Sequence, residues 1–198
     1  MAKILERRKR LLHAADELQR ECFGKSVQKL MEEYGKEENR RAVIQTFEEL
    51  ACRWKELHKD PADETKAASL GITYCLSSIL TKSYAFRLYL YGKEFWLEEK
   101  PAELIWKPPY FFEFLEGDMV SIVKGLGGSF PRLCRAEEDA VMLQCADYYL
   151  AAVQKLCEDM AEEIMDSMGF RELKKTEDFF LFFGRFQGEG EKIWNISS

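Results

Sequence analysis

The stretch YAFRLYLYGKEFWLEE, residues 84–99, decides the fold class that we expect for this chain. Apolar and other side chains alternate on both sides of Gly92-Lys93, as they do in strands. Glycine at the first central position suits the two-residue type II′ turn of a β-hairpin. We therefore predict two antiparallel strands across residues 83–99.

This hairpin would separate its side chains into two different faces, because a two-residue turn fixes the cross-strand register. The register places Tyr89 opposite Trp96 and Arg87 opposite Glu98. The apolar face, expected to pack on helices, comprises Leu88, Leu90, Phe95 and Leu97. The residues predicted to bind a partner, on the aromatic and charged face, are Arg87, Tyr89, Tyr91, Trp96 and Glu98.

The second face is predicted to be exposed and to bind a protein, because Tyr, Trp and Arg supply most binding hot spots. The partner could be a second copy of this chain, which would form a homodimer. The alternative is that a helix of the same chain covers Tyr89 and Trp96. Arg87 would then simply pair with Glu98 across the strands.

The rest of the chain is predicted to be mostly helical, because its apolar residues recur every three or four positions. The expected helices cover residues 4–22, 26–35, 43–57, 61–79, 111–126 and 136–168. Gly24 is expected to end the first of them, and Gly169 to cap the last. The helix from residue 61 is predicted from Asp60-Pro61, because Asp is a typical N-cap and proline is favoured at the first helical position.

The C-terminal run Phe179–Phe183 predicts a strand that is buried on both faces. We expect it to pair with the hairpin, and we interpret the glycines at 184, 188 and 190 as a turn between terminal strands. Residues 1–198 are thus predicted to form one α+β domain, in which helices pack on a small antiparallel sheet formed by the central hairpin and the C-terminal strands.

Composition indicates a folded, acidic chain: 46% of the 198 residues are hydrophobic and the formal net charge is -6. The negative charge argues against nucleic acid, although the basic run 7–10 leaves that contact as a third hypothesis. Charged residues interrupt every long apolar run, so we predict no export signal and no membrane span. The expected location is cytoplasmic.

The six cysteines are predicted to be reduced and mostly buried. Within one helix, Cys145 and Cys157 would lie about 18 Å apart at 1.5 Å per residue, too far to share a zinc ion. Cys134 precedes that helix and remains a candidate reactive thiol. Trp54 and Trp194 are expected to be core residues.

No linear motif for catalysis stands out. The two histidines, His13 and His58, lie in charged helical sequence, and neither has a glutamate three residues before it. We therefore predict no catalytic, metal or cofactor site, and we leave open whether the chain is an enzyme. The expected function is a non-catalytic interaction or regulatory module. The alternative is a small-molecule-binding protein or enzyme whose pocket is formed by Arg87, Tyr89, Trp106 and Tyr110.

Overall fold

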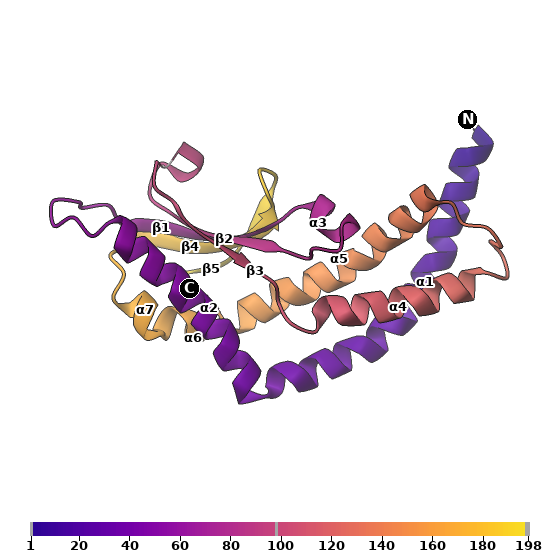
Figure 1. Ribbon diagram of the computed structural model, residues 1–198, viewed down its shortest axis with the longest axis horizontal. Coiled ribbons are helices and arrows are strands. Elements are labelled where there is room, and N and C mark those ends of the chain that lie inside the picture. The colour runs from indigo at the N-terminus through magenta and orange to yellow at the C-terminus, as the bar shows by residue number, and fades with distance from the viewer. Residues whose placement is uncertain (1, 98, 197–198) are drawn as a thin grey trace. The chain divides into compact units, whose positions relative to one another are not determined.

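The computed structural model describes residues 2–97 and 99–196, apart from the side chains of residues 2–4 and 96. Over these residues the fold is α+β, with seven α-helices and one five-stranded sheet (Figure 1). The chain forms two compact units. The helical unit comprises Met1–Lys36, Leu76–Tyr84 and Pro108–Val153, and the sheet unit comprises Glu37–Cys75, Ala85–Lys107 and Gln154–Ser198. That both belong to one domain stays a prediction.

The helical unit contains α1 (Ala2–Gly35), α3 (Leu76–Leu80), α4 (Phe111–Leu126) and most of α5 (Arg135–Asp159). The prediction of a helix over residues 111–126 is confirmed. The predicted break at Gly24 is wrong, because α1 continues to Gly35. A glycine inside a helix costs only about 1 kcal/mol relative to alanine, which packing of the two halves of α1 can offset.

The long helix predicted over residues 136–168 is broken, as α5 is followed by α6 (Ala161–Asp166) and α7 (Met168–Arg171). Gly169 lies inside α7 and does not cap a helix. A Cβ atom on Gly169 would lie 3.3 Å from the Cβ atom of Ala51 on α2 (Glu37–Leu57). Glycine therefore permits close packing of α7 on α2.

The sheet has the strand order β3-β2-β1-β4-β5 and is mixed, so the prediction of a purely antiparallel sheet is wrong. Its strands are β1 (Ala67–Tyr74), β2 (Phe86–Tyr91), β3 (Ala102–Trp106), β4 (Lys175–Arg185) and β5 (Gly190–Asn195). β1 pairs in parallel with β4, whereas the other neighbours are antiparallel. The C-terminal strand and its turn to β5 are as predicted, but β4 pairs with β1 and not with the hairpin.

Residues 67–74 were predicted to be helical and instead form β1 at the centre of the sheet. A short apolar run that is buried on all sides has no periodicity that separates a helix from a strand. Asp60, the expected N-cap, instead begins a turn. The amide of Ala62 donates to Asp60 Oδ1 at 2.9 Å, and the amide of Asp63 donates to the Asp60 carbonyl oxygen.

The predicted hairpin at Gly92-Lys93 does not form. A type II′ turn needs a positive φ at its first central residue, and none of the described glycines has one. Residues after β2 instead leave the sheet through the short 3-10 helix η1 (Phe95–Leu97). The antiparallel partner of β2 is β3, which places Tyr89 opposite Glu103.

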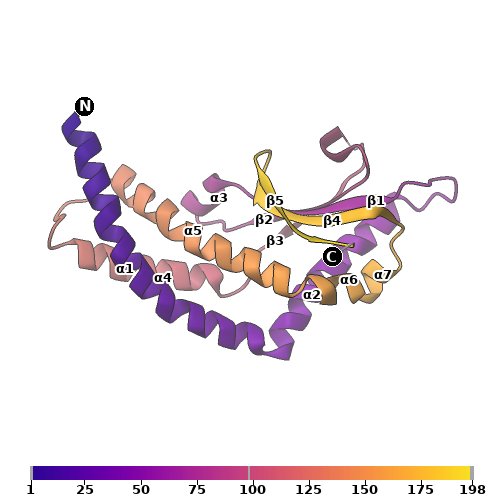
Figure 2. The ribbon, with the colours of Figure 1, turned by 180° about the vertical axis from the view of Figure 1, so that it is seen from behind.

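One face of the sheet packs on helix α2 of the same unit, which lies below the sheet in Figure 1 and is also visible from behind in Figure 2. Phe47 of α2 meets Trp106 of β3 edge to face, with 5.7 Å between ring centroids. Leu88 and Leu90 are buried on this side, as predicted, whereas Leu97 of the same predicted face is 81% exposed and Phe95 joins the cluster on the other face. Trp54 is a core residue, whereas Trp194 is only half-buried.

Within the helical unit, an ion pair joins α1 to the start of α5. Arg7 Nε donates to Glu137 Oε1 at 2.6 Å, and the Cys134 amide donates to Glu137 Oε2 at 3.1 Å. These hydrogen bonds favour the carboxylate, with Arg7 the larger influence, and lower the pKa of Glu137 to about 2.

We expect the stabilising effect of Glu137 to be lost as the pH falls from about 4.5 towards 2. A carboxyl group whose pKa is lower in the folded chain stabilises the fold above its unfolded pKa, and this contribution disappears as the pH falls through the folded value. Thermal melting of the parent and of Glu137→Gln should therefore differ at pH 7 and converge near pH 2. The exposed residue Glu32 provides the control variant Glu32→Gln. A constant difference between parent and Glu137→Gln at all pH values would contradict this expectation.

Candidate binding surface

The second face of the sheet carries a group of aromatic side chains, here called the aromatic face. Its members are Tyr89, Tyr91, Phe95, Phe180, Phe182 and Phe186. Alternation along β2 and β4 directs Tyr89 and Phe182 away from the α2 side, where Leu88 and Leu90 lie. In the sheet unit, Figure 1 shows α2, α6 and α7 on the opposite face. The helices of the sheet unit therefore do not cover the aromatic face.

The two tyrosines are nevertheless buried by their aromatic neighbours. Tyr89 is 6% exposed and Tyr91 2% exposed, so neither presents the broad exposed ring that the sequence prediction assumed. Their rings stack with centroids 5.3 Å apart, and Phe95 lies 4.9 Å from Tyr91. Burial raises the pKa of both phenols, since the charged form loses hydration. The outer layer of the face is formed by the half-buried rings of Phe95, Phe180 and Phe186.

Gly71 of β1 makes room for the centre of this face. It lies between Tyr89 of β2 and Phe182 of β4 in the strand register. A Cβ atom at Gly71 would lie 2.4 Å from the tip of the Phe182 ring, which is closer than van der Waals contact allows. The missing side chain lets Phe182 lie across β1 towards Tyr89, so that rings from two non-adjacent strands join in one cluster.

Two cations lie over rings of the aromatic face. The guanidinium carbon of Arg87 lies 5.3 Å from the centroid of the Phe186 ring, and Lys192 Nζ lies 4.2 Å from that of Phe180. Both distances fit cation–π attraction. Arg87 also donates to the Tyr89 hydroxyl at 3.2 Å and to Glu103 Oε1 at 3.1 Å. The aromatic face thus combines aromatic carbon with two positively charged side chains.

The structure brings together three of the five predicted binding residues, Arg87, Tyr89 and Tyr91. Trp96 lies in η1 and its side chain is outside the description, while Glu98 lies outside the described residues altogether. Among the described residues, the acidic partner of Arg87 is Glu103 of β3.

Of the residues of the alternative pocket, Trp106 lies on the opposite face of the sheet from Arg87 and Tyr89. Trp106 is buried against Phe47 on the helix side of the sheet, away from Arg87 and Tyr89. Tyr110 belongs to the helical unit, where it contacts Tyr34.

Sequence reasoning missed the part of the face contributed by β4 and β5, including Phe180, Phe182 and Lys192. Phe180 and Phe182 do alternate within the C-terminal run, which is a local signal that they share one face. Their position beside β1 and β2 depends on strand pairing over a long sequence distance, for which the sequence carries no local signal.

His58 is held by contacts of both of its ring nitrogens. The His58 side chain is 6% exposed and not at the surface, with Nδ1 2.8 Å from Asp63 Oδ2 and Nε2 3.2 Å from the Lys100 carbonyl oxygen. Both ring nitrogens thus have partners within the chain. His58 and Thr65 lower the pKa of Asp63, with the Thr65 hydrogen bonds the larger cause.

All six cysteines are free, but only Cys145 and Cys157 are buried, so the expectation that most are buried is wrong. Burial raises the pKa of the Cys145 thiol to about 12, which makes it unreactive. Cys134 is exposed. Within the part of the chain that the structure describes, no three His, Cys, Asp or Glu side chains gather as metal ligands would.

Comparison with known proteins gives no relative: no protein-family model, curated protein or solved structure matches this chain. None of the helices in the described residues has the length and apolar character needed to cross a membrane.

Proposed function

We propose that this chain is a non-catalytic interaction module that binds a protein through the aromatic face of its sheet. The observation that carries the proposal is a cluster of six aromatic side chains on the sheet face that the helices of its own unit leave uncovered. Small soluble domains usually bury aromatic residues beneath a second layer of structure. A protein partner would supply that layer.

The chemistry of the face favours a protein over a phosphate-bearing partner. Arg87 is already paired with Glu103, and both cations lie over rings of the same chain. The net charge of -6 also opposes approach to a polyanion. Aromatic rings flanked by arginine are typical of protein-binding hot spots. Ile105 of β3, which is 51% exposed opposite Arg87, extends the apolar area towards the sheet edge.

We expect Ile105→Glu to weaken partner binding at least tenfold while leaving the fold intact, because this exposed side chain contributes little to the core. A hot-spot substitution costs about 2 kcal/mol or more, and about 1.4 kcal/mol corresponds to a tenfold change in affinity. The matched control is Met168→Glu on α7, since Met168 is also apolar and 74% exposed. Sedimentation equilibrium over a range of concentrations first measures self-association of the parent and both variants.

If the parent is monomeric, quantitative pull-down from a cell extract replaces this measurement. A genuine partner should be retained by the parent and by Met168→Glu, and lost with Ile105→Glu. Association that survives Ile105→Glu, or a parent that neither self-associates nor retains any protein in an Ile105-dependent way, would contradict the proposal.

A further inference from the structure

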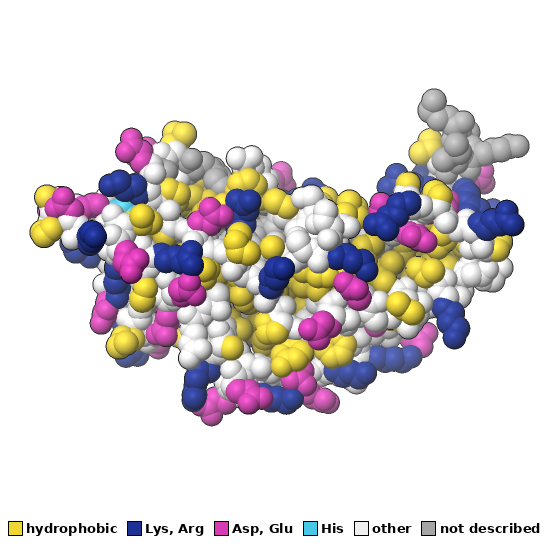
Figure 3. Space-filling model, in the orientation of Figure 1, with side chains coloured by type: hydrophobic (Ala, Val, Ile, Leu, Met, Phe, Trp, Pro, Cys, Tyr) yellow, Lys and Arg dark blue, Asp and Glu magenta, His cyan; other side chains and the backbone are white. Residues whose placement is uncertain are grey.

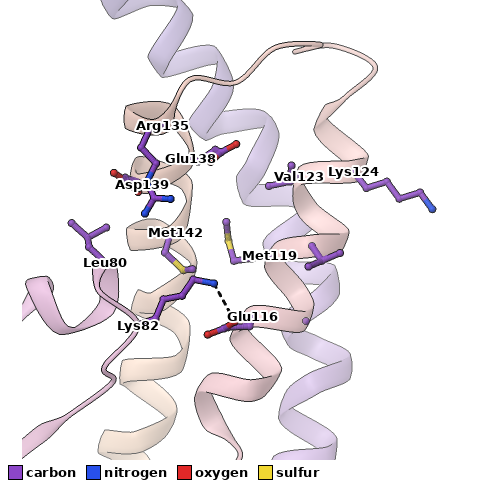
Figure 4. Close-up of a pocket in the computed structure, with 12 residues that line it drawn as sticks. Leu80, Lys82, Glu116, Met119, Val123, Lys124, Arg135, Glu138, Asp139 and Met142 are labelled. Carbon is purple, nitrogen blue, oxygen red and sulfur yellow. Dashed lines mark hydrogen bonds and ion pairs between the residues drawn. The ribbon is translucent and has the colours of Figure 1, made fainter.

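A groove of about 660 Å³ crosses the surface of the helical unit, and all of its lining residues belong to that unit. Its walls are α4, the first turns of α5 and the turn after α3 (Figure 4). Figure 3 shows hydrophobic side chains between charged ones over the region of α4 and α5. The apolar lining residues are Leu80, Met119, Val120, Val123 and Met142.

The groove floor is formed by two methionines that face each other, Met119 from α4 and Met142 from α5 (Figure 4). Methionine side chains are unbranched and adapt to different partners, which makes them common on helix-binding surfaces. Val120 on the wall is 73% exposed. An apolar face of α4 is thus left without cover by the described residues of its own unit.

Gly117 opens the wall of α4. It lies inside the helix, where glycine costs about 1 kcal/mol relative to alanine. A Cβ atom built at Gly117 would meet no other atom within 4 Å, so no contact within the chain requires glycine there. The bare backbone allows another main chain to approach closely.

The charges at the groove indicate the polarity of an occupant. Lys82 Nζ pairs with Glu116 at 3.1 Å at one end, and Arg135 pairs with Asp139 at 2.9 Å at the other. Glu138 is half-buried and points from α5 towards the space between the helices (Figure 4). Among the described residues it forms no ion pair, so a cation from an occupant would complement it.

We propose that this groove binds a short amphipathic α-helix of a partner protein, with its apolar stripe on Met119, Val120 and Met142 and a lysine or arginine beside Glu138. The wall from Glu116 to Lys124 is about 12 Å long, which matches two helical turns. A helix that binds in a groove uses apolar side chains at positions i, i+3, i+4 and i+7, which also span about two helical turns. A β-strand partner would need an open sheet edge, and the described residues of this unit contain no strand.

The probe that tests this site is a synthetic fluorescein-labelled 14-residue peptide, with leucines at i, i+3, i+4 and i+7 and lysines flanking the stripe. A peptide of the same composition without the stripe serves as its control, because it retains the charge. Fluorescence anisotropy should show that the full chain binds the amphipathic peptide at least tenfold more tightly than the scrambled one.

Two variants block the groove without disturbing the core. Gly117→Leu fills the wall and raises helix propensity, so it should melt no lower than the parent while losing at least tenfold in peptide affinity. The matched control Gly24→Leu adds the same side chain inside α1, where a Cβ atom also meets nothing within 4 Å, and should bind like the parent. Val120→Glu serves as a second blocking variant if Gly117→Leu fails to fold. Glu138→Gln should weaken binding several-fold.

Equal binding of the two peptides, no binding by the parent, or full affinity in both blocking variants would overturn the proposal. Binding of the dye 8-anilinonaphthalene-1-sulfonate that is lost in Gly117→Leu, without any peptide binding, would show instead a small-molecule pocket and would also overturn it. All these variants lie in the helical unit, so the outcome does not depend on the aromatic face of the sheet.

Discussion

Replacing Trp54 by alanine is expected to lower the free energy of unfolding by about 3–5 kcal/mol, because a large buried ring is removed and the cavity cannot fully close. Trp54 is 3% exposed in the last turns of α2. Its ring packs on the imidazole of His58, with centroids 4.2 Å apart. The loss therefore affects both the helix packing and the position of His58, whose bonds to Asp63 and Lys100 hold two neighbouring loops.

Urea unfolding of the full chain measures this effect, with Leu57→Ala as the control. Leu57 ends the same helix but is 43% exposed, so its truncation should cost well under half as much. A Trp54→Ala variant that unfolds at the same urea concentration as the parent would remove Trp54 from the core and refute the packing described for α2.

Helices with a clear apolar stripe could be predicted from the sequence because their signal is local. The stripe Val43, Phe47, Leu50 and Trp54 lies on one side of α2 and is buried in the structure. The same reasoning located α4. It failed for residues 67–74, because β1 is buried on both faces and its small apolar residues show neither helical nor strand periodicity.

The candidate site shows the same division between local and long-range information. Alternation along one strand correctly placed Arg87, Tyr89 and Tyr91 on one face, since side chains two residues apart always share a face of a strand. The partners of that face could not be predicted, because Glu103 and Phe182 arrive through strand pairing and not through proximity in sequence. The hairpin prediction failed because the turn type was inferred from glycine alone, while the backbone at Gly92 does not adopt a positive φ.

The helical unit contains a buried polar network that none of the sequence patterns indicated. Asp118 of α4 accepts a hydrogen bond from Ser26 Oγ of α1 at 2.9 Å through Oδ1, and one from the Tyr149 hydroxyl of α5 at 2.6 Å through Oδ2. Tyr149 is completely buried and Ser26 is 6% exposed. Burial, followed by the Asp118 carboxylate, raises the pKa of Tyr149, which keeps the phenol protonated as a donor. One carboxylate thus joins three helices.

Asp118→Ala is expected to lower the free energy of unfolding by about 2–6 kcal/mol, because it leaves two buried hydroxyl groups without their acceptor at about 1–3 kcal/mol each. Tyr149→Phe should cost less, since Asp118 then keeps Ser26. Urea unfolding of both single variants, and of the combined variant Ser26→Ala, Asp118→Leu, Tyr149→Phe, separates the causes. If unpaired hydroxyls are responsible, the combined variant regains much of the lost stability, because it contains no orphaned donor. A combined variant that is less stable than Asp118→Ala would show that the carboxylate itself stabilises the helix packing beyond satisfying these two donors.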